Sequence, residues 1–313
     1  MSGDEQQKGP DLSLVKSGTI AQELSWDVIL SRGVGLYREN FTRFLTLFLP
    51  ISAVLGILNS LLRYYIPLPT LPMNPTPADF QLWFPGFFSS IITLLFYTLI
   101  ISWLVGSVLT GSGVRMTSEA LQGKDASPFS ALRFTASRIV WIWLAGLIAG
   151  ILELLGFIAL IVPGFVVVAM FSLVNEAIVI EGAGPLDALG RSRRLVAGRW
   201  LKTLGLLLLV GLILGAFGIA FSAVARLFGP GETFVTELLN GLVLPLSPIV
   251  TTLYYYSNVG RLSPPLPPAV MSPGVPVSTA KFCTNCGTPA GLADRFCVKC
   301  GTEIRSSTSS GVV

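Results

Sequence analysis

Four cysteines near the C-terminus are the residues whose types and spacing define chemistry most clearly in this chain. Cys283, Cys286, Cys297 and Cys300 form a C-x2-C-x10-C-x2-C pattern, and each pair lies in a repeated Phe-Cys-x-x-Cys-Gly-Thr. Two tight pairs of thiolates match the tetrahedral coordination of Zn²⁺, and four protein ligands leave no position for water or substrate. We therefore predict a structural zinc site; the alternative is a pair of redox dithiols.

The rest of the chain offers little for catalysis. It contains no histidine, the commonest general base, and none of the phosphate-binding, nucleophile-elbow or dinucleotide motifs. Glu153 is the exception of interest, because it interrupts an apolar run where a charge costs about 2.5–3.5 kcal/mol. We predict a non-enzymatic protein with Glu153 as a candidate intramembrane polar site for a proton or cation. The alternative is a protonated or hydrogen-bonded glutamate near the outer interface.

The composition indicates that lipid surrounds most of the chain. Hydrophobic residues make up 52% and charged residues 12%, against roughly 25% charged in soluble domains. Apolar runs long enough for spanning helices lie at 44–62, 80–114, 139–161, 164–181, 203–225 and 238–260. Pro163-Gly164 would form a tight hairpin between the third and fourth, the alternative being one long kinked helix. Pro245 and Pro248 are expected to kink the sixth.

The positions of lysine and arginine predict the orientation. With six spans and the N-terminus inside, only Arg63 and Arg226 fall in outer segments, as the positive-inside rule requires. We predict a multi-pass protein of the cell membrane with both termini cytoplasmic. Residues 66–85 form the first outer loop, and its six prolines are expected to keep it extended.

Three segments that precede the odd-numbered spans share a design. They cover 25–41, 127–139 and 184–200, begin with a small residue or serine, and carry apolar residues at helical spacing. We predict amphipathic interfacial helices and three copies of one unit, each an interfacial helix, a span and a return span. In the third segment Arg191, Arg193, Arg194 and Arg199 are candidate contacts for anionic lipids.

Two family resemblances follow from these motifs. The stretch from Ala177 to Trp200, with Glu181-Gly182 and Gly184-Pro185-Leu186-Asp187-Ala188-Leu189, and the segment from Ile29 to Phe41 resemble the membrane domain fused to some bacterial glycerophosphoryl diester phosphodiesterases. That resemblance covers about 20–260 and implies a membrane module without the catalytic barrel. Residues 281–303 resemble the short zinc-ribbon domain found at the ends of many prokaryotic proteins.

The predicted fold is thus an all-α polytopic membrane protein with about six transmembrane helices, amphipathic interfacial helices and a small C-terminal zinc ribbon. Its expected parts are a disordered cytoplasmic tail at 1–24, a transmembrane domain at 25–261, a Pro-rich linker at 262–280, the ribbon at 281–304 and a disordered tail at 305–313.

The modular layout favours a membrane anchor or adaptor whose cytoplasmic ribbon contacts a protein partner. The alternative is a transporter or lipid-handling protein that uses a cavity within the helix bundle. Expected partners are membrane lipids and a cytoplasmic protein, whereas the weak basic excess of the ribbon argues against nucleic acid. The sequence leaves the oligomeric state open.

Overall fold

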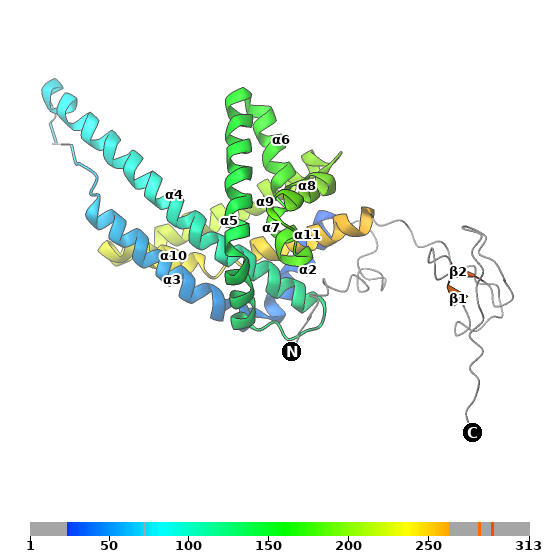
Figure 1. Cartoon of the computed structure of the whole chain (residues 1–313). Coiled ribbons are helices and arrows are strands. Elements are labelled where there is room, and N and C mark those ends of the chain that lie inside the picture. Colours follow the sequence, from blue (N-terminus) through cyan, green and yellow to red (C-terminus); the bar gives the residue numbers. More distant parts are fainter. Residues whose placement is uncertain (1–23, 72, 75, 263–280, 283–288, 291–313) are drawn as a thin grey trace, which may run out of the picture. The chain divides into compact units, whose positions relative to one another are not determined.

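The computed structural model describes residues 24–71, 73–74, 76–262, 281–282 and 289–290. The chain divides into two compact units, Met1–Ser263 and Pro264–Val313. Within the described residues the first unit is helical (Figure 1) and contains α2 (Trp26–Glu39), α3 (Phe41–Tyr65), α4 (Pro77–Leu121), α5 (Pro128–Ala159), α6 (Ile161–Phe171), α7 (Val174–Glu181), α8 (Pro185–Val196), α9 (Trp200–Ala225), η1 (Arg226–Gly231), α10 (Glu232–Asn240) and α11 (Leu246–Leu262). The second contains β1 (Lys281–Phe282) and β2 (Pro289–Ala290).

Five helical segments of the first unit are long and apolar enough to cross a membrane. They are Phe41–Tyr65, Pro77–Leu121, Pro128–Ala159, Ile161–Glu181 and Trp200–Asn240. In the most apolar window of α4 none of the residues is buried, as expected for a surface that lipid covers. The helices therefore indicate a multi-pass membrane protein and confirm the first five predicted spans.

The sixth predicted span, 238–260, is not one continuous helix. α10 ends at Asn240, turns occupy 241–245, and α11 has 17 residues. Pro245 lacks the N–H that would continue the helix to the carbonyl of Gly241, so the expected kink is a complete break. The sixth predicted span is thus divided into α10, the break at 241–245 and α11.

Two turns differ from their predicted positions. The hairpin between the third and fourth spans turns at Leu160, whose φ of −168° and ψ of 155° end α5, so Pro163 lies in the first turn of α6, where it needs no partner for an N–H. Residues 77–85, predicted as extended loop, are helical. Pro77 occupies the first turn of α4, and Thr76 and Asp79 form a capping box that satisfies free amides of that turn.

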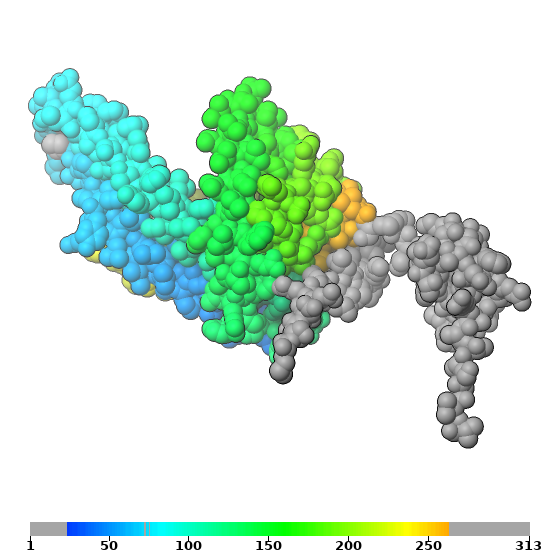
Figure 2. Space-filling model, viewed as in Figure 1, coloured from blue at the N-terminus to red at the C-terminus, as the bar shows by residue number. Residues whose placement is uncertain are grey.

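The helix α4 is much longer than a bilayer requires. Its 45 residues extend about 67 Å at 1.5 Å per residue, against about 30 Å for the hydrocarbon core. Its exposed N-terminal part projects as one arm, and the α5–α6 hairpin projects as another (Figure 2). The C-terminal part, from Ser107 to Ser118, is largely buried within the unit. Membrane crossing and core formation are therefore separate functions of one helix.

The positions of the buried residues agree with the predicted repeat. Ile29, Ala131 and Ala188 occupy the same position after the start of each of the three segments, and each is 0% exposed. Four residues later Gly33, Thr135 and Ser192 are buried as well. The second segment differs from the prediction, because it is continuous with its span in α5, whereas α2 and α8 are separate helices. The three lead-in helices are therefore α2, the first turns of α5, and α8.

The lead-in helices pack around the ends of the helices of the return spans, α4, α7 and α11, which we call the return helices. α5 packs on the C-terminal part of α4, and α8 packs on α7. α2 packs on α11, so the first and last helices of the unit are in contact. The backbone N–H of Leu24 donates to Ser257 Oγ at 3.0 Å, so the beginning of α2 and the end of α11 are adjacent. We call this end of the unit, which contains these helices and most of the buried core, the base, and the opposite end the far end.

Candidate functional site

The four predicted zinc ligands, Cys283, Cys286, Cys297 and Cys300, lie outside the described residues. The two strands on either side of the first pair are described, and they are antiparallel, with Lys281 opposite Ala290 and Phe282 opposite Pro289. In the described part of the chain no group of three or more His, Cys, Asp or Glu side chains could hold a metal ion.

Glu153 lies near the far end of α5. It is seven residues before Leu160, about 10 Å along the helix, and it is partly exposed between the exposed side chains of Leu152 and Leu154. It forms no hydrogen bond or ion pair with another described residue. The structure brings no second polar group to it, and its role as a polar site stays a prediction.

Glu176 is the buried acid of the helical unit. The sequence, with Asn175 and Glu176 near the inner end of the fourth apolar run, predicts interfacial anchors that face the basic cluster at 191–202. Glu176 is instead 1% exposed and lies in the core on α7. The Thr251 hydroxyl of α11 donates to the carbonyl of Pro248, and Glu176 Oε2 is buried without a hydrogen-bond partner among the described residues. The expectation was wrong because α4, α5 and α8 all pack against α7, so that Glu176 is enclosed by helices.

Glu181, at the end of α7, is the acid that pairs with the basic cluster. Arg191 Nη2 lies 2.7 Å from Glu181 Oε1, and Arg191 Nε is 3.0 Å from each carboxylate oxygen. Partial burial opposes the charge of Arg191, but the hydrogen bonds and negative charge of Glu181 outweigh it, so the pKa of the guanidinium lies above its ordinary value. Arg191 therefore joins α8 to α7.

The other three predicted lipid contacts differ from Arg191. Arg193 and Arg194 are exposed on α8 and form no ion pair with a described residue, whereas Arg199 is partly buried at the start of α9. Leu186, on the first turn of the same helix, is 71% exposed. Exposed arginines and an exposed leucine on one short helix are typical of a membrane interface. Arg193 and Arg194 remain the candidates for lipid contact.

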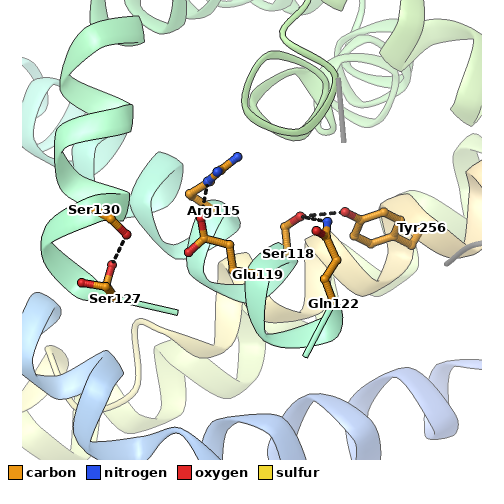
Figure 3. A network of polar contacts seen from close by, with 7 residues as sticks. All are labelled: Arg115, Ser118, Glu119, Gln122, Ser127, Ser130 and Tyr256. Atoms are coloured by element: carbon orange, nitrogen blue, oxygen red, sulfur yellow. Dashed lines mark hydrogen bonds and ion pairs between the residues drawn. The ribbon is translucent and has the colours of Figure 1, made fainter. Parts of the chain in front are cut away.

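A polar network that we did not predict joins α4, α5 and α11 in the base (Figure 3). Arg115 Nε donates to Glu119 Oε1 at 2.7 Å, and the guanidinium lies 4.4 Å from the centre of the Phe134 ring. The hydroxyls of Ser118 and Tyr256 are 2.7 Å apart, and Gln122 Nε2 donates to Ser118 Oγ at 3.3 Å.

The same view includes the start of α5, where Ser130 Oγ donates to the carbonyl of Ser127 at 2.9 Å. The helical spacing of Arg115, Ser118, Glu119 and Gln122 after an apolar run is the signal that could have indicated a helix extending beyond that run.

A second unpredicted polar contact lies toward the far end, between α3 and α10. Asn59 Nδ2 donates to Glu237 Oε1 at 2.9 Å. The break that follows α10 is braced from the base, because the Tyr37 hydroxyl of α2 donates to the carbonyl of Leu242. The last predicted span begins at Leu238 and so leaves out Glu237, one residue before it.

Residues 129–256 match the family described as Domain of unknown function (DUF7847). The match begins in the first turn of α5 and ends in α11, so it covers the second and third of the predicted units. No curated protein and no solved structure is similar to the chain. The comparisons therefore supply no activity or ligand. The resemblances to the phosphodiesterase-associated membrane domain and to the zinc ribbon stay predictions.

Proposed function

We propose that this protein is a non-enzymatic membrane adaptor. The helical unit anchors the chain, and the C-terminal unit binds one zinc ion and contacts a protein partner. In this proposal the first and the last residues of the helical unit both lie on the cytoplasmic side of the membrane. The partner is a cytoplasmic protein.

The strand pair in the C-terminal unit is the observation that carries the proposal. β1 and β2 pair antiparallel on either side of 283–288, which contains Cys283 and Cys286. Paired strands on either side of a C-x2-C bring the ends of this segment together, as expected if both sulfurs bind one ion. Cys297 and Cys300 would supply the other two thiolates. A closed site of four thiolates fits a structural ion that folds a small module.

The helical unit supports an anchoring role. Several of its polar contacts join helices to one another: Arg191 with Glu181, and the Thr203 hydroxyl 2.8 Å from that of Tyr254. The adjacent positions of Leu24 and Ser257 support an even number of membrane passes, with the discontinuous segment as the sixth. Together with the placement of the basic residues, they support a common side for both termini.

The adaptor is tested with the full chain in lipid nanodiscs. Metal analysis should find one zinc per chain, and a variant with Cys283→Ser and Cys286→Ser should lose it. Quantitative mass spectrometry of captured proteins should identify a soluble protein that the wild type retains and that the double variant and a chain truncated after Leu262 both lose. Zinc in the wild type together with identical captured proteins in all three would refute the adaptor.

A second candidate function, transport or lipid handling, is favoured by a different observation. Glu176 is a buried acid with an unpaired oxygen, and its helix α7 packs on α11, which follows the break at 241–245. Broken helices beside buried acids are features of transporter sites. Solute uptake into vesicles that depends on Glu176 and is unaffected by loss of the C-terminal unit would favour transport over the adaptor.

A further inference from the structure

The contact between Asn59 and Glu237 leaves one strong acceptor unsatisfied. Asn59 is 6% exposed. Its Nδ2 donates to Glu237 Oε1 at 2.9 Å, but its Oδ1 is buried without a hydrogen-bond partner. An unsatisfied buried polar atom costs about 1–3 kcal/mol. The pair therefore lacks one hydrogen bond, and a donor facing Asn59 Oδ1 would supply it.

No described cation compensates a negative charge on Glu237. Arg63, one turn beyond Asn59 on α3, donates to Thr233 at 3.2 Å. Arg226 in η1 faces Glu232, with Nε and Oε1 3.9 Å apart. The stretch of α9 from 203 to 225 has no charged residue. Among the residues that the structure describes, Glu237 thus has an amide as its partner and no ion pair, a costly setting for a carboxylate beside lipid.

We propose that Glu237 is a proton-binding site that exchanges its proton with the aqueous phase at the far end. The proton resides on Oε2 and is donated to Asn59 Oδ1, while Asn59 Nδ2 donates to Oε1. The acid and the amide then form a cyclic pair with two hydrogen bonds. Glu237 is partly exposed, so water can supply and remove the proton. Its loss leaves Oδ1 unpaired and the carboxylate without a counter-charge.

The position of the pair couples proton binding to the break in the last pass. α10 lies beside α3 (Figure 1), and Glu237 is one turn before Gly241, where the break begins. Ser52 Oγ, 0% exposed and also unpaired, would be 2.8 Å from a Cβ at Gly241. Deprotonation should weaken the attachment of α10 to α3 at the point where the chain is already interrupted. This site lies in the helical unit and is independent of the adaptor proposal.

Infrared spectroscopy of the full chain in nanodiscs tests the proposal. The wild type should show the carbonyl band of a protonated carboxyl group at neutral pH, and the band should diminish as the pH is raised. Glu237→Gln should lose that band and stay folded, because its amide can make both hydrogen bonds with Asn59. Glu232→Gln is the matched control on the same helix and should retain the band.

A second variant distinguishes the effect of the hydrogen bond between Asn59 and Glu237 from the effect of burial alone. Asn59→Leu removes the donor to Oε1, so the remaining carbonyl band should move to higher frequency. Glu176→Gln identifies any band that belongs to the other buried acid. Spectra of the wild type and Glu237→Gln that coincide at every pH would overturn the proposal, as would a Glu237 band that does not change with pH.

Discussion

The contact between Gly113 and Pro248 offers a test of how tightly the return helices pack. A Cβ at Gly113 would lie 2.5 Å from Pro248 Cγ and 2.9 Å from its Cβ, whereas carbon atoms prefer about 3.5–4.0 Å. The Pro248 ring is bonded to the backbone at both ends and cannot rotate away. Gly113→Ala should therefore push α11 away from α4 by about 1 Å.

The expected cost follows from two opposing effects. Overpacking a tight core costs about 1–3 kcal/mol, and replacing glycine with alanine in a helix returns roughly 0.5–1 kcal/mol. Gly106 is the matched control, because it lies on the same helix and a Cβ there would meet nothing within 4 Å. Gly106→Ala should thus stabilise the protein by roughly 0.5–1 kcal/mol. The two variants should differ by the overpacking cost itself, about 1–3 kcal/mol.

The assay is reversible unfolding in mixed micelles with increasing dodecyl sulfate, followed by tryptophan fluorescence. Gly113→Ala should unfold at a lower detergent fraction than the wild type, and Gly106→Ala at an equal or higher one. If Gly113→Ala proved as stable as Gly106→Ala, the close approach of α4 and α11 would be wrong, and with it the packing of the return helices.

Two further variants, each with a control, test contacts made by the base. Arg191→Gln breaks the ion pair with α7 and should cost about 1 kcal/mol in the same unfolding assay, whereas Arg193→Gln on the exposed face should stay within about 0.5 kcal/mol. A larger loss of stability in Arg193→Gln than in Arg191→Gln would refute the conclusion that Arg191 is paired and Arg193 is not. Arg193→Gln should instead reduce the anionic lipid retained in native mass spectrometry. Tyr37→Phe removes the hydrogen bond to the break and should cost about 0.5–1.5 kcal/mol; Tyr64→Phe, 78% exposed, should cost almost nothing.

Much of the architecture could be predicted from composition and periodicity. Uncharged runs of about 20 residues can only be helices where lipid provides no hydrogen bonds, and the first five spans lie where these runs lie. The lead-in helices followed from helical spacing, and the buried positions of Ile29, Ala131 and Ala188 agree with the predicted repeat. These features depend on the local sequence alone.

The exact positions of turns and breaks could not be predicted from the hydrophobic pattern, because a proline can either begin a helix or end one. A proline tends to end a helix, yet Pro77 and Pro163 occupy first turns, where a missing N–H costs nothing. Pro245 coincides with a break because the flanking helices α10 and α11 pack on different partners. The same residue type therefore begins one element and interrupts another.

The sequence by itself determined that this chain has apolar helices long enough to cross a membrane, and it predicts three similar units and a zinc site at its cysteines. Only the tertiary structure decided which acids are buried and which are paired. Glu176 and Glu181 are five residues apart in one helix, but one faces the core without a counter-charge and the other meets Arg191. Asn59 and Glu237 are far apart in the chain and meet only because α10 returns along α3. Burial and pairing are properties of the packed helices, and no local pattern contains them.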